Sequence, residues 1–337
     1  MLAPWVGALA DRHPKAKVLI MANLIKAAGT LLLLLRVEPL LAYCIVGIGA
    51  ALYSPAKYGI LPELCPHGTL VKANSWIEGS TILAILTGMV IGAKVADASI
   101  SGALLGSILL FLISAATTSL LPKTTGKTPI EGNKIVVFCR EVGDFLALPR
   151  SRFAVLGASL FWAAAACVRV ILIAWAPLVL LLHNASDIAT LTLFLALGII
   201  AGSALAPRLI PLEHLRRARL PAYAMGLLVV GLGLTDALWP ARGVLFLMGT
   251  AGGLFIVPIN AALQELGQQS IGSGGAVAMQ NFFQNGAMLL SVGAYTLAAS
   301  QDVGPTTALW CLGLFVVAAT FLVVLRLPAL DSDATPS

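Results

Sequence analysis

Three basic residues lie inside long apolar stretches of the chain: Lys26, Lys57 and Arg169. If these stretches cross a membrane, an ionisable side chain there is costly unless it faces a cavity or a partner, so each residue is a candidate functional group. Arg169 is near the middle of its stretch, and a guanidinium binds phosphate through two parallel hydrogen bonds. Lys57 follows the helix-bending Pro55 and can offer a point charge to the same anion. The pattern predicts a site for an anionic ligand.

Structural ion pairs are the alternative explanation for these cations. Lys57 and Arg169 have Glu63 and Glu78 as candidate partners elsewhere in the sequence. For Lys26, contact with a neighbouring helix explains the residue as well as a binding role does. The sequence leaves both interpretations open.

Amide and carboxylate side chains form two matched patches. Within each patch the residues recur at a spacing of three or four, which places them on one face of a helix. On the inner face of a bundle they would line a polar cavity, and hydrogen bonding between helices is the alternative. The members are Asn74 and Glu78 in the first patch, and Gln280, Asn281, Gln284 and Asn285 in the second.

A loop motif near the start of the chain reads Gly7-Ala-Leu-Ala-Asp-Arg-His-Pro-Lys-Ala-Lys17. It resembles the loop that major facilitator transporters carry between their second and third helices, with Gly7, Asp11, Arg12 and Lys15 at the matching positions. At a helix end, the Asp11 carboxylate can receive a neighbouring helix N-terminus or a basic side chain. We expect this contact to act as a latch for alternating access; a plain basic cytoplasmic loop is the alternative.

Composition requires that these residues sit in a membrane protein. Of 337 residues, 59% are hydrophobic and 11% are charged, whereas a soluble domain has about 25% charged residues. The mean hydropathy is +0.95. The apolar runs do not alternate as barrel strands do, so we predict an all-α fold that satisfies the backbone within helices. The net charge of +6 is explained by basic cytoplasmic loops.

Hydrophobic runs predict about ten complete transmembrane helices and a fragment of an eleventh at residues 1–10. Basic residues concentrate in three connectors, around 12–17, 122–152 and 208–219, whereas the opposite side holds Arg36, Lys94 and Arg242. By the positive-inside rule the three basic connectors are cytoplasmic. The predicted spans are at about 18–36, 39–60, 74–96, 99–121, 153–182, 187–206, 220–238, 242–264, 274–299 and 304–326.

The basic connector divides the chain into two halves. We predict an N-terminal helix bundle at 1–121, a cytoplasmic linker at 122–152, a six-helix bundle at 153–327 and a cytoplasmic tail at 328–337. The second part of the linker mixes apolar and charged residues, which predicts a helix on the cytoplasmic surface. A solvated linker is the alternative.

The two halves also resemble each other in sequence. Gly49-Ala-Ala-Leu-Tyr-Ser-Pro55 matches Gly252-Gly-Leu-Phe-Ile-Val-Pro258, and Ala8-Leu-Ala-Asp-Arg12 matches Ala204-Leu-Ala-Pro-Arg208. The two polar patches form the third match, all at an offset of about 200 residues, as in the parallel repeats of major facilitator transporters. Compositional bias is the alternative source of these matches.

One stretch is more specific than the general fold. Tyr53-Ser-Pro-Ala-Lys-Tyr-Gly59, followed by Val71-Lys-Ala-Asn74, resembles the bacterial lysophospholipid transporter family of the major facilitator superfamily. Further similar stretches run from Phe161 to Arg169, over Pro258-Ile-Asn-Ala-Ala-Leu-Gln-Glu265, and from Val277 to Leu290.

The resemblance implies inward flipping of lysophospholipids such as lysophosphatidylethanolamine across the inner membrane, by alternating access. It also implies a functional partner, an acyltransferase/acyl-carrier-protein synthetase that restores the diacyl lipid. Lys57 and Arg169 would then serve the phosphate and Glu78 the ammonium of the headgroup. The family has twelve spans, so we expect the first helix and most of the second to be missing here.

Other functions stay open at this point. A drug or metabolite exporter shares the fold, and a non-transporting remnant or an intramembrane lipid enzyme would also be hydrophobic. We find no Gly-x-Ser-x-Gly, P-loop or metal-ligand motif, and the five cysteines form no CxxC pair. We therefore expect a transporter with no enzyme activity, no cofactor, no metal and no nucleic-acid partner.

Overall fold

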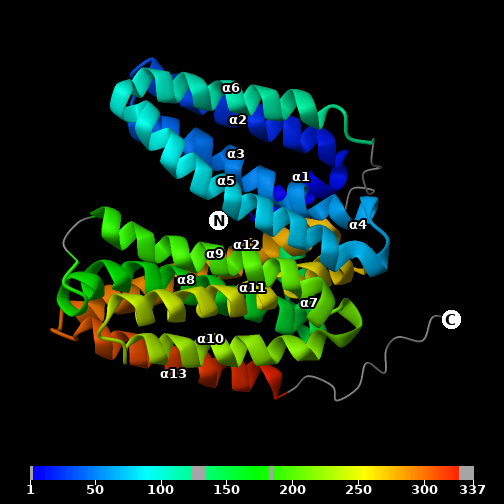
Figure 1. Ribbon diagram of the computed structural model, residues 1–337. Helices are drawn as coiled ribbons and strands as arrows, with labels where there is room; N and C mark the ends of the chain where they lie inside the picture. Colours follow the sequence, from blue (N-terminus) through cyan, green and yellow to red (C-terminus); the bar gives the residue numbers. More distant parts are fainter. Residues whose placement is uncertain (1–2, 123–133, 183–184, 326–337) are drawn as a thin grey trace. The chain divides into compact units, whose positions relative to one another are not determined.

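The computed structural model describes residues 3–122, 134–182 and 185–325 (Figure 1). Within these residues every regular element is a helix, which confirms the predicted all-α class. The predicted tail at 328–337 and the first part of the predicted linker lie outside the described residues. The long helices and their bounds are α2 (Lys15–Leu34), α3 (Pro39–Gly59), α5 (Leu70–Ala98), α6 (Ile100–Thr118), α8 (Pro149–Val179), α9 (Ala185–Leu209), α11 (Leu238–Gln269), α12 (Ser273–Ala299) and α13 (Pro305–Val324).

Shorter helices fill the connectors. The second part of the predicted linker does form a helix, α7. The short elements are α1 (Ala3–Arg12), α4 (Leu61–Leu64), η1 (His67–Thr69), α7 (Lys134–Ala147), η2 (Leu212–Ala218) and α10 (Arg219–Leu232).

Eight helices in the described part of the chain are long and apolar enough to cross a membrane. Two predicted spans fall outside this set although both are helical. One is α10, whose 14 residues are fewer than the roughly 20 that a span needs. The other is α12, whose first half carries the polar patch that begins at Gln280. Polar groups within a predicted span indicate protein-facing positions.

Local sequence explains where several helices begin. Pro39, Pro149 and Pro305 occupy the first turn of α3, α8 and α13, where proline's missing N–H costs nothing and its fixed φ suits the helix. At α6, Ser99 accepts a hydrogen bond of 3.0 Å from the Gly102 N–H, as an N-cap residue does.

The chain divides into two compact units. Unit 1 comprises 1–67, 84–145 and 263–281, and unit 2 comprises 68–83, 146–262 and 282–337. One boundary between the units, at 145/146, lies in the connector at 122–152. The others differ from a simple division into halves, because α5, α11 and α12 each contribute one part to each unit.

In unit 1, α2 packs between α3 and α6 (Figure 1). Ala22 and Leu52 are buried at the α2–α3 contact, together with Val6 of α1. By contrast, α6 leaves large apolar side chains exposed, among them Leu109, Leu110 and Ile113. A helix this apolar on its exposed surface is suited to lipid as its solvent.

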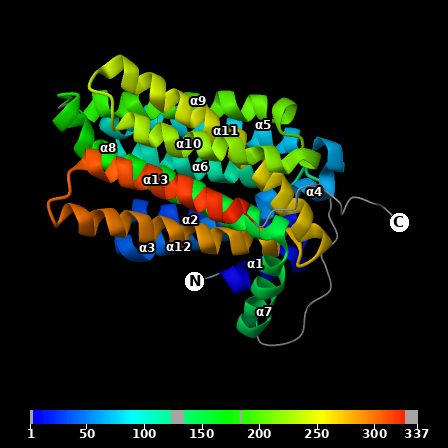
Figure 2. The ribbon, with the colours of Figure 1, turned by 90° about the horizontal axis from the view of Figure 1, so that it is seen from below.

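In unit 2, α8 and α11 form the buried centre. Phe153 and Phe255 make an edge-to-face contact at 6.2 Å between ring centroids, and Trp175 is fully buried. Helices α10 and α13 pack side by side (Figures 1 and 2).

Glycines set the closest helix approach in unit 2. A Cβ at Gly253 of α11 would fall on the Ile199 carbonyl oxygen of α9 and within 2.7 Å of the Ser203 nitrogen. Such backbone contact is typical of small-residue interfaces in membranes. At Gly47, Gly88 and Gly92, by contrast, a Cβ would meet nothing within 4 Å, so these glycines are not needed for close packing.

We expect Gly253→Val to destabilise the protein, because the added atoms displace backbone. Overpacking typically costs about 1–3 kcal/mol of folding stability. At Gly253 the neighbouring atoms are backbone, which yields less easily than side chains, so we expect a loss of stability of at least this size. The matched control is Gly243→Val on the same helix, where a Cβ meets nothing within 4 Å. Thermal unfolding in detergent measures both variants; equal melting temperatures would contradict the packing argument.

Candidate functional site

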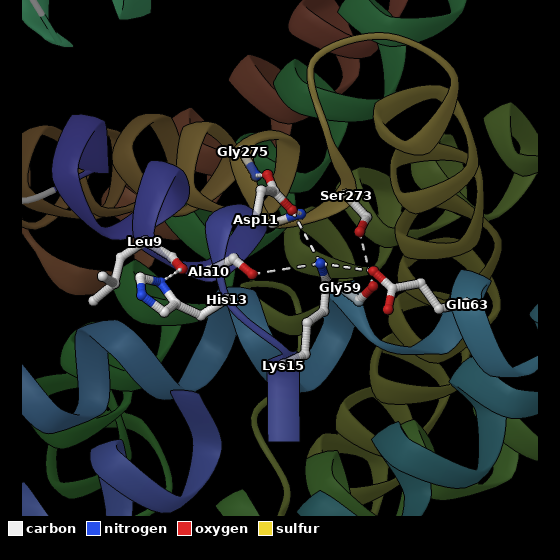
Figure 3. A network of polar contacts seen from close by, with 10 residues as sticks. Leu9, Ala10, Asp11, His13, Lys15, Gly59, Glu63, Ser273 and Gly275 are labelled. Carbon is white, nitrogen blue, oxygen red and sulfur yellow. Dashed lines mark hydrogen bonds and ion pairs between the residues drawn. The ribbon is translucent and has the colours of Figure 1, made fainter. Parts of the chain in front are cut away.

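The Asp11 carboxylate caps a helix that is distant in sequence. Its Oδ1 accepts a hydrogen bond from the Gly274 N–H at 3.0 Å, and its Oδ2 accepts one from the Gly275 N–H at 2.7 Å (Figure 3). These donors lie in the first turn of α12, where N–H groups have no partner within the helix. The preceding residue is Gly272, which has no side chain to cap with. Asp11 supplies the missing acceptor and places negative charge at the positive end of the helix dipole.

A buried lysine joins the same carboxylate to a second one. The Lys15 ammonium lies 3.1 Å from Asp11 Oδ1 and 2.7 Å from Glu63 Oε1 (Figure 3). Only 3% of Lys15 is exposed, and a buried ammonium is stable only with such partners. Nearby, the Ser273 hydroxyl donates to the Gly59 carbonyl at 2.8 Å. The network thus ties α1, α2, α3, α4 and the start of α12 together within unit 1.

Glycines make room for this network. Gly272 has φ of +98°, and a Cβ there would collide with the Asp11 carboxylate. At Gly274 a Cβ would lie 2.8 Å from Asp11 Oδ1, and at Gly7 it would lie 3.1 Å from the Ala278 Cβ. Residues without a side chain are therefore required for the carboxylate to reach the backbone of α12.

Helix α7 brings another carboxyl group into the field of Asp11. Partial burial raises the pKa of Glu141 above its usual range, and the negative charge of Asp11 raises it further. Phe145 of α7 is almost fully buried, whereas Val136 is exposed. The apolar side of α7 is thus at least partly covered by protein.

The first polar patch lies in unit 2 and is buried. Glu78 is 4% exposed, and its Oε1 accepts a hydrogen bond from the Asn260 side-chain amide at 3.0 Å. Asn74 is fully buried, and the hydroxyl of the neighbouring Ser75 donates to the Ser203 carbonyl at 2.6 Å. This geometry matches the alternative of hydrogen bonds between helices, which join α5 to α9 and α11.

The second polar patch begins in unit 1. Gln280 is buried, and the Asn281 amide donates to the Ser54 hydroxyl of α3 at 3.1 Å. Farther along α12, Gln284 is half-buried and Asn285 is exposed. The exposure of the patch residues therefore increases along α12, from buried Gln280 to exposed Asn285.

The two predicted phosphate-binding cations lie in different units. Arg169 of α8 is exposed at the middle of a 31-residue helix, and no hydrogen bond or ion pair joins it to any residue that the structure describes. In unit 1, the Lys57 ammonium lies 4.9 Å from the centroid of the Tyr58 ring. Of their candidate partners, Glu63 pairs with Lys15.

Sequence reasoning missed part of the network. The sequence indicates Glu63 only as a partner for the intramembrane cations, and it does not point to Ser273, Gly274 or Gly275 as site residues. Their signal is the run Gly272-Ser-Gly-Gly275 at the start of α12, because glycine at position 272 offers no capping side chain. Among the described residues, no cluster of three His, Cys, Asp or Glu side chains could hold a metal ion.

Comparison with known sequences identifies similar proteins. A family model described as Major Facilitator Superfamily matches residues 1–291. The lysophospholipid transporter LplT of Photorhabdus laumondii is 40% identical over 311 residues, which cover 91% of this chain and 78% of that protein. The protein of the same name from Salmonella heidelberg is 39% identical, over 90% of this chain and 77% of that one.

Solved structures show the same fold at low sequence identity. The E. coli fucose:proton symporter FucP superposes with a TM-score of 0.72 at 16% identity, covering 96% of this chain and 86% of that one. The human organic anion transporter MFSD10 gives a TM-score of 0.74 at 15% identity, covering 95% and 80%. These similarities confirm the predicted fold of two repeated helix bundles.

We expect Asp11→Asn to lower the melting temperature of the protein in detergent. The change removes the charge that two N–H donors and Lys15 share, while Lys15 keeps Glu63 as a partner. The expected loss is therefore about 1–3 kcal/mol, as for hydrogen bonds that lose a charged acceptor. Asp144→Asn is the control, because that carboxylate is 78% exposed. A variant as stable as the control would show that the cap contributes nothing.

We expect Glu141→Gln to stabilise the protein at neutral pH only. Because the folded-state pKa is raised, the ionised carboxylate costs stability above that pKa, and the cost disappears as the pH falls through it. The gain from glutamine should thus be present at about pH 7.5 and vanish near pH 4, around the ordinary glutamate pKa of about 4.3. Melting temperatures across this range test it, with exposed Glu38→Gln as control. A gain that does not change with pH would contradict the assignment.

Proposed function

This chain belongs to the major facilitator superfamily, and from that membership we propose that it transports lysophospholipids such as lysophosphatidylethanolamine across a bacterial inner membrane by alternating access. The relatives that share about 40% of its sequence over most of its length are named lysophospholipid transporters. The net direction is toward the cytoplasmic side, where the lipid is reacylated. The superfamily membership supports a transport role without enzyme activity on this chain.

The observation that carries the proposal is the state of Arg169. A guanidinium at mid-span is costly unless a cavity or partner receives it, and Arg169 has no hydrogen-bond or ion-pair partner among the described residues. A phosphate diester would supply a partner through two parallel hydrogen bonds. The ligand's own charge would thus offset the cost of keeping an arginine inside the membrane.

The other predicted binding residues take different roles. Lys57 is half-buried in unit 1, and we assign it as a second cation for anionic headgroups. Glu78 accepts a hydrogen bond from Asn260, and we assign it to holding α5 against α11. Gln284 and Asn285 are the more exposed end of the second patch, and we assign them to contact with the headgroup.

Asp11 and Lys15 suit a latch. Alternating access requires contacts that hold one state and can be exchanged for others, and two N–H donors with one carboxylate form such a discrete contact. Water can replace the donors when the cap opens, because Asp11 lies at the end of α1 and not within a long span. Gly7 and Arg12 lie on α1, the helix that carries this carboxylate, and we assign them to the same latch.

The proposed orientation in the membrane rests on the basic connectors, and the proposed partner rests on the chemistry of the transported lipid. The basic connectors support a cytoplasmic position for one side of the protein, by the positive-inside rule. A lysophospholipid delivered there needs an acyl donor and a transferase to become a bilayer lipid again, so we propose an acyltransferase/acyl-carrier-protein synthetase as the functional partner.

The test is uptake of labelled lysophosphatidylethanolamine into spheroplasts that lack their own lysophospholipid transporter. We expect uptake with this chain and a loss of about 10- to 100-fold with Arg169→Ala, as for a charged hydrogen bond of roughly 1.5–3 kcal/mol. Arg169→Lys should keep part of the activity, because it keeps the charge but not the two-pronged geometry. Arg217→Ala, an exposed arginine of η2, is the control.

Two results would count against the proposal in different ways. Equal uptake by Arg169→Ala and the control would remove the phosphate role of Arg169. No uptake by well-expressed chain would remove the lysophospholipid assignment and favour an exporter of drugs or metabolites, or a protein without transport activity.

A further inference from the structure

Lys26 lies near the middle of α2, within unit 1. Its ammonium is 3.9 Å from the centroid of the Tyr53 ring on α3 and 4.8 Å from that of Phe111 on α6. The side chain is half-buried. Three helices therefore converge on one ammonium, and two of them present aromatic rings to it.

The position is built around this side chain. A Cβ at Gly49 of α3 would come within 2.7 Å of the Lys26 Cγ, so α3 carries glycine where the lysine stem passes. One turn before Lys26 on α2, the Asn23 side-chain amide donates to the Ser114 hydroxyl of α6 at 2.9 Å. The glycine at position 49 thus leaves room for the lysine stem between α2 and α3, and the Asn23–Ser114 bond joins α2 to α6 one turn away.

Lys26 forms no ion pair with any carboxylate that the structure describes. Two acids of unit 1, Asp11 and Glu63, pair with Lys15. The positive charge of Lys57 also acts on Lys26 and repels it.

Aromatic rings compensate such a cation only in part. A cation–π contact attracts an ammonium less strongly than an ion pair does in a dry site, and an ammonium within a membrane span requires a partner or a polar cavity. Two ring faces occupy two sides of the ammonium, while its remaining N–H donors have no carboxylate acceptor among the described residues. An anion with oxygen acceptors would complete this environment.

We propose that Lys26 is a further anion-binding residue, which holds the phosphate of a lysophospholipid headgroup between the rings of Tyr53 and Phe111. The inference rests on the proposed lysophospholipid transport and adds a site in unit 1 that is separate from Arg169. The phosphate oxygens accept from the ammonium, and the rings contact the glycerol carbons. Lys57, one turn after Tyr53 on α3, adds attraction for the same anion.

The test is equilibrium binding of labelled lysophosphatidylethanolamine to the purified full chain in detergent. We expect Lys26→Met to weaken binding by about 10-fold or more, whereas Lys26→Arg stays within a few-fold of the unchanged protein. Monooleoylglycerol, which has no phosphate, should bind both variants equally. The matched control is Lys17→Met, an exposed lysine of the same helix.

Inorganic phosphate separates the two possible sources of the anion. Competition by millimolar phosphate that is lost in Lys26→Met would show that phosphate alone is recognised. No competition, with lipid binding still dependent on Lys26, would show that the lipid headgroup is required. Both results support an anion site at Lys26.

A structural role would give a different pattern. If Lys26→Met binds lysophosphatidylethanolamine as well as the unchanged protein but melts at a lower temperature, the rings and the lysine only hold helices together and the proposal is overturned. If the unchanged protein binds no lysophosphatidylethanolamine, the proposed function fails instead; phosphate binding to that protein, compared with Lys26→Met, then still decides the anion site.

Discussion

In a hydrocarbon medium each charge and each unpaired backbone donor needs a partner, and this constraint organises the polar part of the protein. Asp11 shows it most directly. The start of α12 has free N–H groups and a glycine in place of a capping side chain, so the acceptor comes from another helix. That carboxylate in turn needs a cation, and Lys15 needs a second acid, Glu63. One helix end without a capping side chain of its own thus involves residues of three other helices, α1, α2 and α4.

The fold was predictable because apolar length and period depend on the sequence directly. Runs such as the one around Leu31 could only be helices in a bilayer. The boundaries of α3 and α13 follow from prolines at Pro39 and Pro305. For α10 and α12 apolar length is a weaker guide. Both segments are helical as predicted, but α10 is too short and α12 too polar to be among the helices that could cross a membrane by length and composition.

The kinds of contact that the site residues make were predictable from the sequence, but the partner residues were not. The motif at Asp11 indicated contact with a helix N-terminus or a lysine, and the structure shows both contacts. Which helix supplies the N-terminus depends on tertiary packing and cannot be read from the spacing of residues. Glu78 shows the same limit, since its burial against Asn260 depends on where α11 lies. Sequence gives the charge of a residue, whereas only packing gives its partner.

Helix α12 contributes residues to both units, so one continuous helix is held in two different ways. Its first turn is held by the Asp11 carboxylate in unit 1. Farther along, the Ser291 hydroxyl donates to the Ala163 carbonyl of α8 at 3.1 Å in unit 2. The first contact involves a charged group and the second only neutral groups, so a change of ionisation at Asp11 would affect one part of α12 and leave the hydrogen bond of the other part in place.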